Sequence, residues 1–293
     1  MQLSKVGVLS PGDMGQAVAG RIKATGREVY TSLAGRSERT AALAKEAGLT
    51  DAGSVRKVVE TCDAVLSVMN PGSAVDAARE VAQAMRKTKK KLVYVDCNAI
   101  APQTVKEIET LISEAGGTFI DGGIIGPPPR GKAKTKLYIS GPNATLLTEI
   151  EDEQLRIRVV GERNGDASAV KMCYASMTKG TMALGMELLI AARKLGVEEQ
   201  VVAEMQDSQG DMLEWVLSRS VSMPPKAYRW VPEMNEIAKT FEGAGLTPRI
   251  LLGAADMYEF IAATPLGKES PEDARKAGRS GTDIVHGLAD GTS

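Results

Sequence analysis

The sequence Lys5-Val6-Gly7-Val8-Leu9-Ser10-Pro11-Gly12-Asp13-Met14-Gly15 runs from a short apolar segment into a glycine-containing turn. Apolar residues then recur at helical spacing as far as Gly26. A dinucleotide-binding turn uses three glycines: for the tight turn, for close approach of the diphosphate, and for packing of the helix on the strand. Gly12 and Gly15 occupy the second and third positions, and Ser10 replaces the first. The alternative is an ordinary tight turn, but the flanking strand and helix signals favour a nucleotide site formed by Ser10, Pro11, Gly12, Asp13 and Met14.

The first 160 residues alternate between β-prone and helical segments. We expect strands at residues 5–10, 28–33, 63–68, 92–96 and 118–121. We expect helices between them, including residues 37–47, 73–87 and 103–115. Strands that alternate with helices of about 10–15 residues are typical of βαβ units in a doubly wound, mostly parallel sheet. The amino-terminal half is therefore predicted to be a Rossmann domain.

Strand signals stop after about residue 160. Residues 166–195 predict one long helix, which would measure roughly 45 Å. Further helical segments follow near residues 197–219, 231–243 and 247–263. A single hydrophobic core usually stops growing at about 250–300 residues, so two domains are expected for a chain of 293 residues. We predict an NADP-binding Rossmann domain over residues 1–162 and an all-α substrate and dimerisation domain over residues 163–293, joined by the long interdomain helix.

Charge and hydrophobicity exclude several classes of protein. Lys and Arg total 36 against 37 Asp and Glu, and the pI is about 6.1, so no basic surface for nucleic acid is indicated. No apolar run reaches the roughly 18–20 residues of a membrane span, so no membrane partner is expected. The single histidine, His286, makes a histidine-rich metal site or a Ser-His-Asp triad a poor candidate. We predict no metal.

The cysteines indicate a reducing compartment. Cys62, Cys97 and Cys173 are odd in number, far apart and set among apolar residues, which predicts buried, reduced thiols. The first residues lead directly into a strand-like segment without signal-peptide features. We expect a cytoplasmic protein.

The end of the second β-prone segment indicates which cofactor is bound. Enzymes that use NAD place an Asp or Glu about 20 residues after the glycines, where it bonds the ribose hydroxyls. Residues 33–39 read Leu-Ala-Gly-Arg-Ser-Glu-Arg, with no acid at the strand end. Arg36, Ser37 and Arg39 are suited to a 2′-phosphate, so we predict NADP(H). The alternatives are that Ser37 only caps a helix beside solvated arginines, or that Glu38 contacts the ribose.

One face of the long helix carries polar groups where an interdomain helix would usually be apolar. Lys171, Tyr174 and Thr178 recur at i, i+3 and i+7, which places them on the same face. A partly desolvated lysine beside a nicotinamide can act as a general acid or base.

Five short motifs in a fixed order resemble those of the β-hydroxyacid dehydrogenase and 6-phosphogluconate dehydrogenase-like superfamily. They are the amino-terminal turn, Met69-Asn70-Pro71, Val95-Asp96-Cys97-Asn98, Asp121-Gly122-Gly123, and the segment from Gly165 to Lys171. Residues 165–175, Gly-Asp-Ala-Ser-Ala-Val-Lys-Met-Cys-Tyr-Ala, together with Thr178-Lys179-Gly180, are most similar to one branch of this superfamily. That branch has a phosphogluconate-dehydrogenase-like carboxyl-terminal domain of unknown function. The resemblance covers about residues 5–265.

The resemblance implies hydride transfer between NAD(P) and a hydroxyl or carbonyl carbon of a small molecule. It places the family's catalytic lysine at Lys171, and it assigns the cofactor to Met69, Asn70, Pro71 and Cys97, with Asn98 in the same loop. It also implies a homodimer formed through the helical domain, in keeping with the apolar Met- and Ala-rich long helix.

Two departures bear on the substrate. Tyr174 stands in place of the family's asparagine after the lysine, and Ile125-Gly126-Pro127 replaces the Ser-Gly-Gly loop that normally helps to hold a carboxylate. Arg130 and Lys132 either take over as anion holders or are plain loop charges. The residues expected around the substrate are Gly122, Gly123, Ile125, Arg130 and Thr178.

Our hypothesis is that Lys171 exchanges a proton with the substrate oxygen while Tyr174 and Asn98 orient it. An imine reductase or reductive aminase of the same architecture is one alternative, favoured by the apolar loop and opposed by Lys171. A non-catalytic NADPH-binding sensor is another. A short-chain dehydrogenase is disfavoured because Tyr174 and Lys179 are one residue too far apart for Tyr-x-x-x-Lys. Glu233 is expected at the edge of the core.

Overall fold

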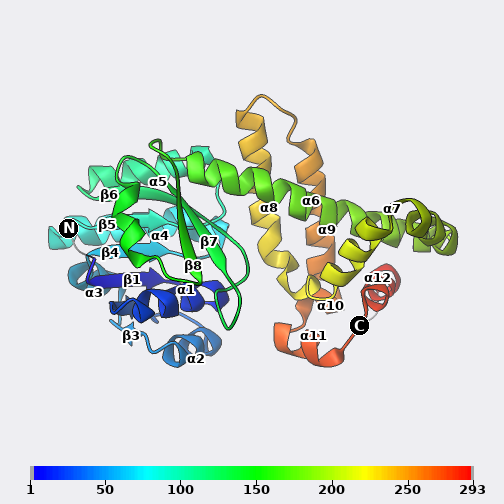
Figure 1. The fold of residues 1–293 in the computed structure, drawn as a ribbon, viewed down its shortest axis with the longest axis horizontal. Helices are drawn as coiled ribbons and strands as arrows, with labels where there is room; N and C mark the ends of the chain where they lie inside the picture. The colour runs from blue at the N-terminus through cyan, green and yellow to red at the C-terminus, as the bar shows by residue number, and fades with distance from the viewer. Residues whose placement is uncertain (1–2, 292–293) are drawn as a thin grey trace. The chain divides into compact units, whose positions relative to one another are not determined.

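The chain forms two compact units. A computed structural model describes residues 3–291, and the contacts within it divide the chain into Met1–Met172, the α/β unit, and Cys173–Ser293, the helical unit. The division falls inside one continuous helix, α6 (Asp166–Lys194), whereas the sequence placed it before that helix (Figure 1). The first turns of α6 therefore belong to the α/β unit.

The α/β unit is built on an eight-stranded sheet in the order β3-β2-β1-β4-β5-β6-β7-β8. The strands are β1 Lys5–Leu9, β2 Glu28–Thr31, β3 Thr50–Asp51, β4 Ala64–Ser67, β5 Val93–Asp96, β6 Thr118–Ile125, β7 Thr135–Ser140 and β8 Leu155–Gly161. Each neighbouring pair from β3 through β6 is parallel, β7 runs antiparallel to β6, and β8 runs parallel to β7. The predicted doubly wound, mostly parallel sheet is confirmed.

The helices of this unit cover both faces of the sheet. They are α1 Asp13–Ala24, α2 Glu38–Glu46, α3 Val55–Thr61, α4 Ala74–Thr88 and α5 Pro102–Glu114, with short 3₁₀ segments η1 Pro71–Ser73 and η2 Ala144–Ile150. Leu66, Val95 and Ile120 share a core cluster with α1 and η2, whereas the adjacent Val65, Tyr94 and Phe119 share one with α3, α4 and α5. Successive strand residues point to opposite faces, so both faces are apolar, as a buried parallel sheet requires.

Every regular element described after Gly161 is a helix. The helices are α6, α7 Glu198–Ser220, η3 Pro224–Lys226, α8 Ala227–Gly243, α9 Arg249–Ala263, α10 Pro265–Lys268, α11 Pro271–Ala277 and α12 Gly281–Asp290. Helix α7 is kinked at Gln209, where φ is −146° and ψ is 39°. The predicted all-α second half is confirmed, and within the described residues none of its helices is long and apolar enough to cross a membrane.

Several elements were not expected. Strands β3, β7 and β8 lie outside the predicted segments, and β2 ends at Thr31, two residues before the expected end. The polar segment after residue 267 forms helices because Ser270 and Ser280 cap them, the latter in a full capping box with Asp283. Cys62 and Cys97 are buried as predicted, but Cys173 is exposed because it faces outward on α6.

Candidate functional site

The turn after β1 has the backbone of a nucleotide-binding turn despite its serine. Ser10 has φ of 58°, in the left-handed region that glycine enters freely, and the Gly12 N–H donates to the Ser10 carbonyl at 2.7 Å. A non-glycine residue pays roughly 1–2 kcal/mol for this conformation. Ser10 therefore takes the conformation that the first glycine of the motif would provide.

Gly12 and Gly15 have different physical reasons to be glycine. A Cβ at Gly15 would lie 2.7 Å from the Ser10 carbonyl oxygen, so the turn itself forbids a side chain there. A Cβ at Gly12 would meet only that oxygen, at 4.0 Å. The protein leaves the space beside Gly12 open, as close approach of a diphosphate requires. Gly12 is also the N-cap of α1, where the helix dipole favours an anion.

The other predicted residues of this turn divide between core and surface. Pro11 is buried, and the Met14 side chain packs against the core cluster under α1. Asp13, in the first turn of α1, remains partly exposed and forms an ion pair with Arg130. Hence the turn presents backbone groups and one charged pair to its surroundings.

The segment after β2 carries exposed cations. Arg36, Ser37 and Arg39 are all exposed, and Ser37 is the N-cap of α2, with its hydroxyl accepting from Thr40 N at 3.3 Å. The capping alternative for Ser37 is thus realised in this structure. The sequence reading missed Asp51 at the end of β3, whose Oδ1 accepts from Leu33 N at 3.1 Å. This carboxylate fixes the segment that presents Arg36.

Asn98 ties together the segments that follow β4 and β5. Its Nδ2 donates to Ser67 Oγ and to Asp96 Oδ2, both at 2.9 Å, and its Oδ1 accepts from Met69 N at 2.6 Å. The residue is only 2% exposed. Its amide is hydrogen-bonded within the protein and positions the Met69–Asn70–Pro71 segment, which leads into η1; the contact of Asn98 with the substrate stays a prediction.

Cys97, which was predicted to contact the cofactor, directly precedes Asn98. It is a core residue, 5% exposed, in the cluster that includes Val95 and Ile120. Burial, with the charge of Asp96 second, holds the pKa of its thiol well above the ordinary value. The thiol therefore packs in the core, and the contact of Cys97 with the cofactor stays a prediction.

Asp121 fixes the start of α6 to the sheet. Its carboxylate is fully buried and accepts from Gly165 N at 3.0 Å, Ser168 N at 2.9 Å, Ser168 Oγ at 2.6 Å and Ser140 Oγ at 2.9 Å. Burial raises the pKa of this carboxyl, and the hydrogen bonds from Ser168, Ser140 and Gly165 oppose that shift. The carboxylate thus serves the free N–H groups at the helix N-terminus.

Gly122 and Gly123 are glycines because β6 is crowded there. A Cβ at Gly122 would lie 2.8 Å from the Asp96 carbonyl oxygen, and one at Gly123 would lie 2.9 Å from Lys171 Cβ and 3.0 Å from the Ala167 carbonyl oxygen. Both were predicted to contact the substrate, but their lack of side chains serves internal packing. Gly123 affects the site indirectly: because it has no side chain, the half-buried Lys171 can lie against β6.

These features gather at one edge of the sheet. Because β1, β4, β5 and β6 are parallel neighbours, their carboxyl ends share an edge, and β6 continues beyond the Asp96–Asp121 pair. The order of strands reverses between β1 and β4, and open α/β sheets bind ligands outside such a point. The turn at Ser10, the segment at Met69 and the Gly123–Lys171 contact belong to this edge.

Arg130, which was predicted to hold a substrate anion, is bonded to Asp13. Its Nη2 donates to the Asp13 carbonyl at 2.6 Å and to Asp13 Oδ1 at 2.9 Å. The contacts tie the β6–β7 loop to the first turn of α1. Ile125, at the end of β6, is half-buried. In this structure the guanidinium is paired with Asp13, and its contact with a substrate anion stays a prediction.

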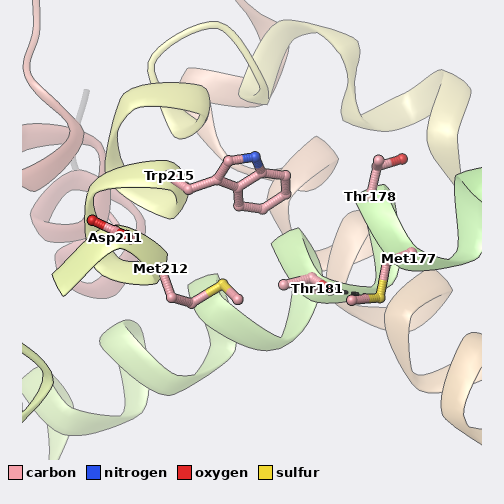
Figure 2. Close-up of a pocket in the computed structure, with 6 residues that line it drawn as sticks. All are labelled: Met177, Thr178, Thr181, Asp211, Met212 and Trp215. Atoms are coloured by element: carbon pink, nitrogen blue, oxygen red, sulfur yellow. Dashed lines mark hydrogen bonds between the residues drawn. The ribbon is translucent and has the colours of Figure 1, made fainter. Parts of the chain in front are cut away.

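In the helical unit, Tyr174 is exposed and Thr178 borders an apolar hollow of about 340 Å³. Figure 2 shows the hollow between α6 and α7, with Met177, Met212 and Trp215 facing it. The Thr178 hydroxyl lies 3.4 Å from the Ala175 carbonyl of its own helix. The residues named as lining this hollow all belong to the helical unit.

Glu233, which the sequence placed at the edge of the core, is buried and paired with Lys179. Lys179 Nζ lies 2.7 Å from Glu233 Oε1 and 5.4 Å from the centre of the Trp230 ring, and Tyr258 Oη donates to the Lys179 carbonyl at 2.7 Å. Burial, with the Glu233 charge second, raises the pKa of Tyr258. This cluster joins α6, α8 and α9 and had no signature in the sequence.

Among the described residues, no group of acidic, cysteine and histidine side chains could hold a metal ion.

Comparison with known proteins identifies the parts of the chain. Residues 5–151 match the NAD binding domain of 6-phosphogluconate dehydrogenase, and residues 192–261 match a domain of unknown function, DUF1932. A solved conserved protein of unknown function, described as structurally similar to 3-hydroxyacid dehydrogenases, is 34% identical. The alignment covers 94% of this chain and 99% of that one, with a TM-score of 0.64.

Two more distant proteins extend the comparison. The 3-hydroxyisobutyrate dehydrogenase of Pseudomonas aeruginosa is 24% identical over 90% of this chain and 89% of its own. An imine reductase variant from Myxococcus stipitatus, solved with NAD+, shares the fold at 21% identity and a TM-score of 0.52, over 98% of this chain and 99% of its own. From the matched amino-terminal domain and the 34% identical relative, this chain belongs to the family of proteins built on the NAD-binding domain of 6-phosphogluconate dehydrogenase.

Proposed function

We propose that this protein is an NADP(H)-dependent oxidoreductase that transfers a hydride between the nicotinamide and the hydroxyl or carbonyl carbon of a small substrate. The observation that carries the proposal is the anchoring of α6 by Asp121, which brings Lys171 against Gly123 at the carboxyl edge of the sheet. The cofactor turn belongs to the same edge. A cation with a transferable proton and a dinucleotide turn are the two components that such a reaction needs.

The cofactor and the residues of the site have different roles in this reaction. The nicotinamide, when bound, supplies or accepts the hydride. In the reducing direction, the Lys171 ammonium gives its proton to the substrate oxygen as that oxygen gains charge; in the oxidising direction, the neutral amine takes the hydroxyl proton. Tyr174 would contact the substrate. Asn98 is a positioning residue, because it holds the Met69 segment through the 2.6 Å hydrogen bond to Met69 N.

The turnover of Lys171→Ala tests the assignment. If Lys171 is the general acid or base, kcat falls by roughly 10²–10⁴ while the Kd for NADPH is unchanged. Lys171→Met, which keeps the stem of the side chain, loses turnover equally, and Lys194→Ala at the opposite end of α6 does not. Unchanged turnover of Lys171→Ala would remove Lys171 from the mechanism.

The preference for NADP(H) rests on the cations after β2. The exposed Arg36 and Arg39 suit a 2′-phosphate, and Asp51 is already used in fixing the backbone at Leu33. Titration with NADPH and NADH tests this. Arg36→Ala and Arg39→Ala are each expected to weaken NADPH by about ten- to a hundredfold and to leave NADH unchanged. Lys45→Ala, an exposed change on the same helix, is the control. Equal affinities of the wild type for both cofactors would refute the preference.

Reduction of imines is a second candidate, favoured by the observation at Arg130. Its guanidinium pairs with Asp13, and the nearby Ile125-Gly126-Pro127 segment is apolar, so the loop offers less to a carboxylate than a Ser-Gly-Gly loop does. A panel that pairs ketones with amines, run beside 3-hydroxy acids such as 3-hydroxyisobutyrate, separates the two reactions. Tight binding of NADPH with no turnover across the panel would favour a sensor.

We also propose a homodimer formed through the helical unit. Met177 and Leu184 on α6 are 67% and 66% exposed, and Leu188 continues the same stripe. Large exposed apolar patches usually mark an interface. Light scattering is expected to give twice the chain mass, and Leu184→Glu is expected to give a monomer. Leu246→Glu, at an apolar position outside α6 that is 58% exposed, is the control; a monomeric wild type would contradict the proposal.

A further inference from the structure

The loop between β6 and β7 is held rigidly at both ends. It contains Pro127, Pro128 and Pro129 followed by Arg130, and the Thr135 hydroxyl donates to the Pro127 carbonyl. The Gln154 amide donates to the carbonyls of Gly131 and Ala133, the latter at 3.2 Å. Proline fixes φ, so the loop loses little further freedom when it makes a contact. We call residues 126–134 the proline strap.

Arg130 projects from this strap onto the first two turns of α1. Besides the two bonds to Asp13, its Nε lies 3.0 Å from the Gln16 amide oxygen in the amide orientation that satisfies both groups. One guanidinium thus meets two residues of α1 that are separated by one turn. The contact joins residues 117 positions apart in the sequence, so only the folded chain brings the two charges together.

The location of Asp13 gives this pair a consequence for binding. Asp13 directly follows Gly12, the N-cap beside which the turn leaves room for a diphosphate. A carboxylate suits an empty helix N-terminus, but it repels a second anion placed within a few ångströms of it. Both members of the pair are 45% exposed, and exposed ion pairs contribute little to folding. The pair should therefore matter more for anion binding than for stability.

We propose that Arg130 is the counter-charge of Asp13 that allows the turn after β1 to accept a dinucleotide diphosphate, with the proline strap as its rigid support. This inference rests on the proposed cofactor. Arg130 is then a positioning residue for the cofactor. The β6–β7 loop, which the sequence assigned to the substrate, would support cofactor binding.

A double-mutant cycle measured by NADPH titration tests the inference. Arg130→Ala is expected to raise the Kd for NADPH by about tenfold or more, because the Asp13 charge is left uncompensated. Asp13→Asn alone is expected to stay within about threefold of wild type. Addition of Asp13→Asn to Arg130→Ala should restore the affinity to within about threefold of Asp13→Asn. Arg130→Lys keeps the charge and should bind NADPH within about threefold of wild type.

Lys132→Ala is the matched control, since Lys132 is an exposed cation of the same strap, and circular dichroism melts establish that each variant is folded. Unchanged affinity of Arg130→Ala, or failure of Asp13→Asn to rescue it, overturns the inference while wild-type binding of NADPH still stands. If the wild type binds neither NADPH nor NADH, the proposed cofactor fails and this inference fails with it. Loss of turnover with intact NADPH binding counts against the proposed reaction alone.

Discussion

The turn after β1 and the start of α6 serve the same edge of the sheet but are built differently. In the turn, the shape comes from neighbours in sequence: Ser10 is left-handed, and Gly15 lies against the Ser10 carbonyl. At the start of α6, the Asp121 carboxylate reaches residues 44 and 47 positions away. The first device is local and steric, and the second is long-range and electrostatic. Mutations at the start of α6 should therefore affect folding, whereas a mutation in the turn should affect binding alone only where space is left open, as at Gly12.

The largest effect is expected at Asp121. Asp121→Asn removes the negative charge and replaces one of the two acceptor oxygens with an NH2 donor, so the four hydrogen bonds cannot all be kept in their present direction. Loss of these buried bonds is expected to lower the free energy of unfolding by about 3–5 kcal/mol. Urea denaturation measures this. Ser140→Ala, which removes one of the four bonds, should cost clearly less; equal stability of Asp121→Asn and wild type would show that the anchor is not needed.

The two glycines of the turn should separate folding from binding. Gly15→Ala places a Cβ 2.7 Å from a backbone oxygen and is expected to lower the free energy of unfolding by about 1–3 kcal/mol. Gly12→Ala fills open space, so its stability should stay near that of wild type while its affinity for NADPH falls at least tenfold. Thermal melts and NADPH titration together measure the contrast. Similar stability losses in both variants would remove the distinction.

A smaller effect with a defined pH dependence is expected at Asp152, which accepts from the backbone N–H of Gln154, the residue that bonds the proline strap. Burial acts to raise the pKa of this carboxyl, but hydrogen bonds from Leu155 N, Arg21 and Gln154 N together lower it below the ordinary value. Because the folded pKa is the lower one, the stabilisation is complete above about pH 4 and is lost as the pH falls through the folded value. Asp152→Asn should flatten the pH dependence of urea unfolding below pH 4. An unchanged acid profile would contradict this.

The smallest effect is expected at Ser10. Ser10→Gly relieves left-handed strain of roughly 1 kcal/mol but adds unfolded-state entropy of about the same size, so stability should change by less than about 0.5 kcal/mol. Ser10→Val, which is β-branched, should be clearly destabilised. Differential scanning calorimetry of the two variants provides the measurement. A large gain from glycine would mean that the serine side chain disturbs the turn.

Features of the site that depend on residues close together in sequence could be predicted, whereas those that depend on contacts between distant residues could not. The turn at Ser10, the doubly wound sheet and the long helix carrying Lys171 were all evident in local patterns. The sequence pointed to Asn98 and Cys97 but not to their burial or to the internal hydrogen bonds of Asn98, because these depend on which strands become neighbours. Strands β7 and β8 were missed, although β7 supplies Ser140 to the Asp121 network.

The sequence by itself determined the alternation of strands and helices, the glycine turn and the order of motifs, since these depend on residue periodicity and backbone sterics over a few positions. Only the tertiary structure decided that Asp121 anchors α6, that Gly123 makes room for Lys171, and that Arg130 serves Asp13. Each of these contacts joins residues far apart in the chain. Their partners are chosen by which strands become neighbours and by where buried charges find donors, and no local pattern records that choice.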